Sequence, residues 1–232
     1  MSVLVFAESS EGKLVKASFE AVSYGAKLAS DAGTELNVIS FGGASDEELS
    51  KLGNYGAGKI MVERNVNEVQ PFQMASIVEE AATRVGADTI IFSYDVTGKA
   101  VAPIVSAKMK AGLVAGVLDY PELSDGFVVR RAVFSGKAFA KVKVSSAVRI
   151  VGIMPNSVGA VEMAGSPAVE DFNGNVVGAK VTLKETRKED LGGQVPLPEA
   201  ELVVSAGRGL KGPENWGMVE DLASALGATT AC

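Results

Sequence analysis

Residues 1–110 repeat an order of short apolar runs and longer stretches with apolar residues at helical spacing. Val3–Ala7 and Thr89–Ser93 consist mainly of apolar residues without polar alternation, which is typical of parallel strands covered on both faces. Residues 18–32 place apolar side chains three and four positions apart, and Gly33 follows as a residue that can end a helix. This order predicts a mainly parallel sheet whose strands are joined by right-handed helical crossovers.

The same pattern predicts five more elements in this region. They are strands at 36–41 and 59–62, and helices at 46–52, 72–85 and 100–110. Beyond residue 112 the segments become β-rich. Phe127–Phe134 and Ala138–Val144 flank Ser135-Gly136-Lys137, which predicts a β-hairpin. Further strands are predicted at 147–153 and 176–183, with a loop at 156–167 between them. Together these elements predict a three-layer α/β domain with a mainly parallel, Rossmann-like sheet and a hairpin-rich second half.

A change in composition divides the chain near residue 185. Residues 184–199 combine charges with a Gly-Gly pair and two prolines, which disfavour regular structure. We therefore predict an N-terminal domain at 1–185, a linker at 186–199 and the start of a second Rossmann-like domain at 200–232. That last segment offers one strand, a glycine-rich loop and one helix at 216–226. Because such a unit buries too little surface to be stable alone, we expect the domain to continue beyond Cys232.

The segment AELVVSAGRGLKGPEN, residues 200–215, holds the candidate binding site. Gly207, Gly209 and Gly212 have the G-x-G-x-x-G spacing between a strand and a helix, which lets the backbone approach a pyrophosphate at a helix N-terminus. Arg208 adds a guanidinium that suits a phosphate or an electron-rich ring. The alternative is a tight turn that needs glycine for backbone reasons, with Arg208 as a surface residue. An NAD-type domain would need an acidic ribose-binding residue beyond Cys232.

Charge and residue content exclude several classes of function. The 232 residues carry 22 Lys and Arg against 28 Asp and Glu, so the net charge is −6 and the basic character of nucleic-acid-binding proteins is missing. The absence of histidine excludes Ser-His-Asp and Cys-His triads and His-ligated metals in this sequence. A single Cys excludes a self-contained iron–sulfur cluster. We therefore expect no catalytic residue and no metal site, but binding or redox chemistry on an organic cofactor.

The N-terminal residues predict the compartment. MSVLVFAESSEGK begins directly on a strand and lacks the basic and apolar regions of a signal peptide. No apolar run approaches the roughly 20 residues of a membrane span. A single Cys at the last position agrees with a reducing compartment. These features predict a cytoplasmic protein without membrane insertion.

Several motifs resemble the α subunit of electron transfer flavoproteins. VVSAGRGLKGPENWGMVEDLASALGA is similar to the segment that opens the flavin domain of that family, and VLVFAESSEGKL to its first strand and loop. VVRRAVFSGKAFAKVKV resembles its hairpin, and VRIVGIMPNSV resembles the strand and turn that follow. The resemblance covers essentially the whole chain and is most specific at residues 203–215. Ala206, Arg131 and Phe134 depart from the family's usual glycine, proline and tyrosine.

The resemblance implies an FAD-containing electron carrier rather than a substrate-converting enzyme. FAD would accept electrons from flavin dehydrogenases of the acyl-CoA dehydrogenase type, as in fatty acid β-oxidation, and pass them to a membrane quinone reductase or similar acceptor. It also implies a heterodimer in which the domain at 1–185 contacts a β subunit, and AMP is expected in that partner only. Among the family's FAD contacts Arg208 carries over, beside Gly207 and Gly209, and most of the site is expected beyond Cys232.

Residues 93–103 form a second candidate site, a polar loop at the carboxyl end of a strand, where α/β proteins bind ligands. Thr97, Gly98 and Lys99 have the groups to hold a phosphate, which would make the chain a nucleotide-binding, universal-stress-like regulatory domain without a redox role. The alternative is a capped helix start with Thr97 near the N-cap.

Overall fold

The computed structural model describes residues 2–66, 70–185, 195–197 and 200–232. It divides into two compact units, Met1–Thr182 and Leu183–Cys232. The predicted linker at 186–199 lies largely outside the described residues, so the predicted domain boundaries stay predictions. No helix in the described ranges has the length and hydropathy that crossing a bilayer requires.

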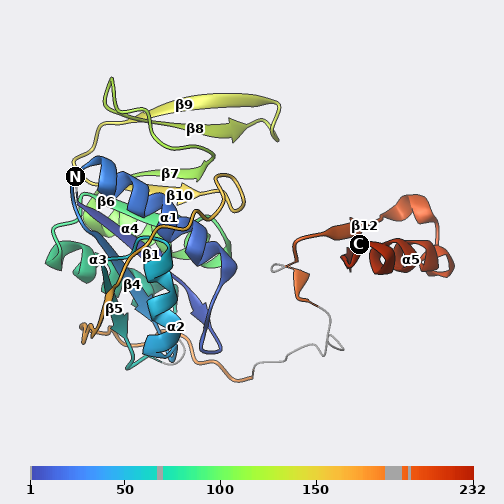
Figure 1. The fold of residues 1–232 in the computed structure, drawn as a ribbon, viewed down its shortest axis with the longest axis horizontal. Helices are drawn as coiled ribbons and strands as arrows, with labels where there is room; N and C mark the ends of the chain where they lie inside the picture. The colour runs from blue at the N-terminus through green and yellow to red at the C-terminus, as the bar shows by residue number, and fades with distance from the viewer. Residues whose placement is uncertain (1, 67–69, 186–194, 198–199) are drawn as a thin grey trace. The chain divides into compact units, whose positions relative to one another are not determined.

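The first unit is built on a nine-stranded sheet in the order β11-β5-β4-β1-β6-β10-β7-β8-β9 (Figure 1). The sheet is parallel from β11 to β7, and β8 and β9 add an antiparallel hairpin at one end. The strands are β1 (Val3–Ala7), β4 (Leu36–Phe41), β5 (Lys59–Glu63), β6 (Thr89–Ser93), β7 (Gly112–Val117), β8 (Phe127–Val133), β9 (Ala138–Val144), β10 (Arg149–Ile153) and β11 (Ala168–Asp171). The predicted α/β class with a mainly parallel sheet is confirmed.

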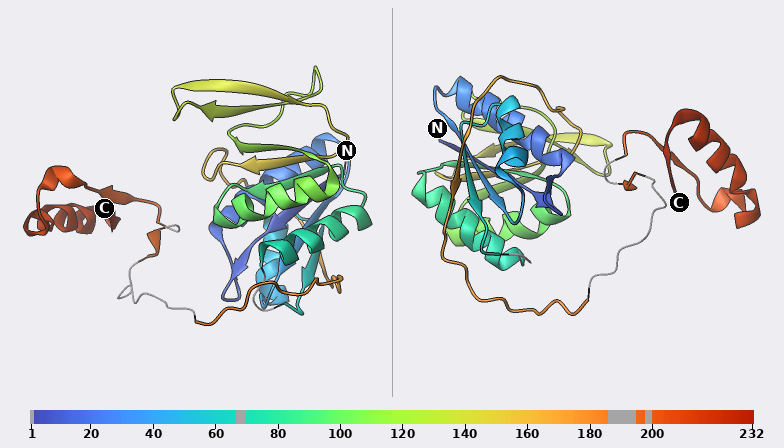
Figure 2. Two further views of the ribbon diagram at one scale, coloured as in Figure 1. Left: turned by 180° about the vertical axis from the view of Figure 1, so that it is seen from behind. Right: turned by 60° about the horizontal axis from the view of Figure 1, so that its bottom comes forward.

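Helices cover both faces of this sheet and complete three layers (Figure 2). One face carries α1 (Lys16–Asp31) and α2 (Asp46–Ser50), which a 3-10 turn at Lys51–Asn54 extends. The other face carries α3 (Pro71–Arg84) and α4 (Val96–Met109). A two-stranded β2–β3 ribbon (Ser9–Ser10 and Lys13–Leu14) joins β1 to α1.

Each face of the sheet has its own hydrophobic core. Because successive side chains of a strand point to opposite faces, Val3 and Val5 join the core under α1, while Leu4 and Phe6 join the core under α3 and α4. Gly25 lets α1 approach the sheet closely, since a Cβ there would lie 2.4 Å from Cγ2 of Val5. All five residues of β1 are buried, as expected for a central parallel strand.

Two predicted elements differ in the structure. Helix α4 begins at Val96, four residues before the predicted start, because the Asp95 carboxylate caps it by accepting a hydrogen bond from Gly98 N at 2.8 Å. Thr97 is therefore inside the helix rather than at its N-cap. The strand predicted at 176–183 does not form; a strand forms instead at Ala168–Asp171, parallel to β5.

Residues 172–182, which we name the strap segment, lie along α3 in place of the predicted strand. Side chains bind the backbone of the strap: Gln73 Nε2 donates to Val177 O at 2.9 Å, and Glu80 Oε2 accepts from Asn175 N at 2.8 Å. The Arg84 guanidinium lies 4.1 Å from the centre of the Phe172 ring. The strap backbone is thus satisfied by side chains of a helix, which a strand pattern does not anticipate.

The second unit is a small β-α-β arrangement. Strand β12 (Val203–Ser205) pairs in parallel with β13 (Thr229–Ala231), and α5 (Gly217–Leu226) connects them. Val219 and Ala223 form the buried face of α5. The sequence pattern predicts only one strand here, because β13 has three residues and no hydrophobic periodicity.

Candidate functional site

The glycine-rich loop begins at the carboxyl end of β12. Ala206 N donates to Ala231 O at 3.2 Å, so the start of the loop lies beside the end of β13. This is the edge of parallel strands at which α/β proteins bind ligands. The structure brings Gly207, Arg208 and Gly209 together there, and all three are exposed.

Gly207 and Gly209 are not explained by the local structure of the protein: the space beside them is open, and their backbone conformations do not require glycine. Gly207 has φ −126° and ψ −158°, a conformation open to any residue, and Gly209 is not among the residues with positive φ. A Cβ added to either would meet no heavy atom within 4 Å. A turn that needs glycine for backbone reasons therefore does not explain Gly207 or Gly209. Of the two interpretations that the sequence allowed, close approach of a ligand to the backbone is the one that remains.

The strained residue of the loop is Lys211. Its φ of +69° and ψ of −39° form a three-residue γ-turn in which Gly212 N donates to Leu210 O at 2.9 Å. Asn215 Nδ2 also donates to Leu210 O at 2.7 Å, so a side chain beyond the turn stabilises it. Lys211 and Asn215 thus fix the path of the loop. Neither residue was predicted from the sequence, because no residue spacing marks a non-glycine γ-turn.

The loop does not lead directly into the helix as expected. Two 3-10 turns, Arg208–Leu210 and Pro213–Asn215, lie between β12 and the first residue of α5, Gly217. Arg208 is therefore in a separate short turn and not in the first turn of α5. The G-x-G-x-x-G spacing here encodes a longer loop than the direct strand-to-helix turn of dinucleotide-binding proteins.

The chemistry of this loop fits an anionic, planar cofactor. Arg208 is exposed, and no described residue forms an ion pair with its guanidinium. A guanidinium can bind a phosphate with two parallel hydrogen bonds or stack on a ring. Next to it, the backbone at Gly207 and Gly209 is open. The guanidinium of Arg208 and the open backbone of the two glycines therefore occupy adjacent positions at the carboxyl end of β12.

The second candidate site lies in the first unit, where β1 and β6 end side by side. The crossover direction of the chain changes between these strands, which is the usual place for a ligand. Here the protein fills it with its own groups. Thr97 Oγ1 donates to Glu8 Oε1 at 2.7 Å, and Gly98 N donates to Asp95. Lys99 Nζ lies 4.9 Å from the centre of the Tyr94 ring.

Two carboxylates thus occupy the position that a phosphate would take. Burial raises the pKa of Glu8 above its ordinary value; the hydrogen bond from Thr97 opposes this shift, and the charge of Asp95 adds to it. A bound phosphate would meet the repulsion of Glu8 and Asp95 at the start of α4. This arrangement favours the capped-helix alternative over nucleotide binding in the first unit.

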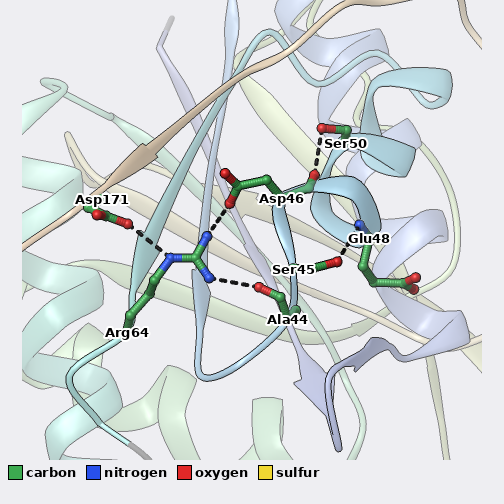
Figure 3. Close-up of polar contacts among 7 residues, drawn as sticks. All are labelled: Ala44, Ser45, Asp46, Glu48, Ser50, Arg64 and Asp171. Atoms are coloured by element: carbon green, nitrogen blue, oxygen red, sulfur yellow. Dashed lines mark hydrogen bonds and ion pairs between the residues drawn. The ribbon is translucent and has the colours of Figure 1, made fainter.

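A third polar cluster at the same sheet edge has a structural role (Figure 3). The Arg64 guanidinium donates to Asp171 Oδ1 at 2.9 Å, to Ala44 O at 2.8 Å and to the Asp46 carboxylate. Ser45 Oγ caps α2 by accepting from Glu48 N at 3.1 Å. Each of the three guanidinium nitrogens of Arg64 donates to a protein acceptor, so the cluster joins β5, β11 and the start of α2 (Figure 3).

Fold and site together define a class: a two-unit α/β protein whose second unit is a β-α-β arrangement with an open glycine-rich loop at the carboxyl end of its first strand. Comparison with protein families agrees. The Electron transfer flavoprotein domain matches residues 3–176, and the Electron transfer flavoprotein FAD-binding domain matches residues 196–232. The chain belongs to the electron transfer flavoprotein family and is of its α type, as the sequence motifs predicted.

Similar proteins carry corresponding names. The chain is 26% identical over 230 residues to electron transfer flavoprotein subunit alpha of Bacillus subtilis, a match that covers 97% of this chain and 70% of that protein. It is 28% identical over 233 residues to the subunit of the same name from Syntrophomonas wolfei, covering 97% and 70%. It is 26% identical over 243 residues to subunit LctC of the lactate dehydrogenase (NAD(+),ferredoxin) of Acetobacterium woodii, covering 99% and 56%.

Proposed function

We propose that this chain is the α-type subunit of an electron carrier and that the loop at 206–212 contributes to its FAD site. The observation that carries the proposal is the open loop of Gly207, Arg208 and Gly209, which lies inside the segment matched by the FAD-binding domain. When bound, FAD supplies the redox chemistry, and the protein supplies binding, orientation and electrostatics. The chain is proposed as a carrier rather than an enzyme that converts a substrate.

Each residue of the loop has a distinct part. The backbone at Gly207 and Gly209 lets a large planar or phosphate-bearing group approach without a side chain in the way. Arg208 supplies a positive charge that stabilises the pyrophosphate or a negatively charged form of the ring system. Asn215 and Lys211 hold the turn that follows, so the cation keeps its place relative to the glycines.

The partners follow from the family. We propose a heterodimer with a β subunit that holds AMP, electron donors of the acyl-CoA dehydrogenase type in fatty acid β-oxidation, and a membrane quinone reductase as acceptor. The name of the Acetobacterium woodii relative refers to a lactate dehydrogenase, so lactate-oxidising enzymes should be tested as electron donors as well. We also propose a cytoplasmic location, which the single Cys supports because low cysteine use agrees with a reducing compartment.

The test is cofactor binding by the full chain co-expressed with its partner subunit. We expect a yellow complex with one FAD per heterodimer, which flavin absorbance and native mass spectrometry would measure. Gly207→Ala should leave thermal stability unchanged, because the space around it is open, but weaken FAD binding by about tenfold or more. Gly217→Ala is the matched control, since its site is equally open but lies at the start of α5.

Two results would contradict the proposal. A colourless complex that contains no flavin would remove the electron-carrier assignment. A Gly207→Ala variant with unchanged FAD affinity would show that the loop does not contact the cofactor, even if FAD binds elsewhere in the chain.

A further inference from the structure

The strap segment, residues 172–182, follows β11 and runs to the end of the first unit at Thr182. Side chains of α3 and its N-cap bind the backbone of the strap, and they are those of Gln70, Gln73, Glu80 and Arg84. Because these residues are three, seven and four positions apart, they lie along one face of the helix. The strap therefore determines where the chain leaves the first unit.

The inner half of the strap, residues 172–176, is anchored in the core. Phe172 is only 2% exposed, and Val176 packs against the core under α3 and α4. Gly174 N donates at 2.6 Å to Oε2 of Glu63, a side chain that is fully buried. Apolar burial and a hydrogen bond to a buried carboxylate thus hold this half to the unit.

The outer half of the strap, residues 177–182, is held by polar contacts at the surface. All of its residues are exposed, and its larger apolar side chains, Val177 and Val181, are 40% and 68% exposed. They therefore bury little apolar area against the helix. Gln73 Nε2 donates to Val177 O at 2.9 Å, which fixes the start of this half.

Gln70 holds the far end of the outer half. Its Oε1 accepts hydrogen bonds from Lys180 N at 3.0 Å and from Val181 N at 3.2 Å, and its Nε2 donates to Val181 O. The side-chain amide thus pairs with Val181 as the backbone of a neighbouring strand would. Lys180 Nζ also lies 4.7 Å from the centre of the Phe72 ring, which is itself 52% exposed. We name the contact of Gln70 with Lys180 and Val181 the clasp.

Water competes for every contact of the clasp. An exposed hydrogen bond stabilises a segment only slightly, because water can bind both partners when the bond breaks, and holding the segment in one conformation costs entropy. Segments with few buried apolar contacts and exposed hydrogen bonds open locally while the rest of the protein stays folded. The outer half of the strap therefore opens more readily than the inner half.

We propose that the outer half of the strap detaches from α3 as one segment and that the clasp controls this opening, so that the connection between the two units has two lengths. In the closed state the chain leaves the first unit at Thr182, and in the open state it leaves after Val176. The six residues released span up to about 20 Å when extended. The consequence for the carrier rests on the proposed function: opening increases the range over which the second unit can carry FAD.

The experiment measures amide hydrogen exchange and trypsin cleavage after Lys180 in the full chain co-expressed with its partner subunit. Gln70→Met keeps the length of the side chain and removes the hydrogen bonds of the clasp. Exchange at Lys180 and Val181, and cleavage after Lys180, should accelerate about fivefold or more. Exchange at Gly174, in the inner half, should change by less than about twofold.

A control variant and a distance measurement complete the experiment. Glu79→Gln is the control, because Glu79 lies on the same helix but pairs with Lys108 of α4; both rates should stay within about twofold. Spin labels on Cys232, in the second unit, and on Ser30→Cys, at an exposed position of α1, report the separation of the units. In Gln70→Met their distance distribution should extend to values up to about 20 Å longer.

Three results would overturn this proposal. Unchanged exchange at Lys180 in Gln70→Met would show that the clasp does not control opening, and equal acceleration at Lys180 and Gly174 would show that the two halves do not open separately. Faster exchange with an unchanged distance distribution would show that the strap does not set the length of the connection. Flavin absorbance of the same sample tests the proposed function separately: a colourless heterodimer would remove the electron-carrier assignment, and with it the consequence for FAD, even if the strap opens as expected.

Discussion

The Nε of Arg64 donates to Oδ1 of Asp171 at 2.9 Å, across 107 residues of sequence. Arg64 directly follows β5, and Asp171 ends β11, so this pair fastens the outermost strand to its neighbour. The same guanidinium reaches Ala44 O and Asp46 at the start of α2. One side chain thus connects three elements at the carboxyl edge of the sheet.

Replacing Arg64 by Met should therefore destabilise the first unit by about 1–2 kcal/mol. The carboxylates are well exposed, so each ion pair contributes little, but the bond to the Ala44 carbonyl is lost as well. Urea unfolding measures the free energy of unfolding. Lys27→Met is the control, because it removes one exposed pair with Asp31 on α1 and should barely change stability. Equal effects of both variants would contradict the joining role of Arg64.

Glu20 anchors a distant loop, and its replacement should release that loop. The side chain is only 6% exposed, and its carboxylate accepts hydrogen bonds from the backbone N–H groups of Asn156, Val158 and Gly159 at 2.7, 2.9 and 3.0 Å. Glu20→Gln replaces one acceptor oxygen by a donor and should cost about 1–3 kcal/mol. Hydrogen exchange at residues 156–159 should accelerate more than exchange elsewhere. Unchanged protection of these amides would show that the loop is held by other contacts.

Glu8→Gln should make the stability of the first unit less dependent on pH. Burial raises the pKa of Glu8 above 4.5, so the folded protein binds this proton more tightly than the unfolded chain. The resulting stability is fully present below about pH 4.5 and is lost as the pH rises through the folded-state pKa.

The variant should therefore be more stable than the original at pH 7 and equal to it in acid. Gln can still accept the hydrogen bond from Thr97, so the comparison isolates the charge. Thermal unfolding between pH 3.5 and 7 provides the measurement. A variant that is less stable at pH 7 would mean that the carboxylate charge is stabilising and that the direction of the shift is wrong.

Lys211→Gly should stabilise the glycine-rich loop by about 1 kcal/mol, because glycine adopts a positive φ without steric cost. Lys211→Ala is the control: it removes the same side chain but keeps the strain, so its stability should match that of the original. The free energy of unfolding is measured on the full chain. If Ala and Gly behave alike, the strained turn is not formed in solution.

Sequence patterns predicted the central elements because those elements bury apolar side chains at regular spacing. The runs at Val3–Ala7 and Thr89–Ser93 became β1 and β6, and the arms around Ser135-Gly136-Lys137 became the β8–β9 hairpin. Each of these segments carries its own hydrophobic period or turn signal. The glycine spacing likewise identified the loop at Gly207 and Gly209 as a candidate site.

The peripheral elements carry no such hydrophobic period or turn signal in their sequence. The strand at Ala168–Asp171 contains two carboxylates and is mostly exposed, so only its pairing with β5 makes it a strand. The segment at 176–183 has apolar residues that suggested a strand, yet Gln73 of α3 and the N-cap residue Gln70 bind its backbone groups. Local propensity is a weak guide where backbone partners come from elsewhere in the chain.

The sequence by itself determined the order of buried strands and helices, the mainly parallel sheet and the position of the glycine-rich loop, since these depend on side-chain periodicity and on glycine. The tertiary structure alone decided which polar groups meet. Glu20 lies against Asn156, Glu8 against Thr97, and Arg64 against Asp171. A charged residue gives no local sign of its partner, because the free energy of burying it depends on hydrogen bonds that exist only after the chain has folded.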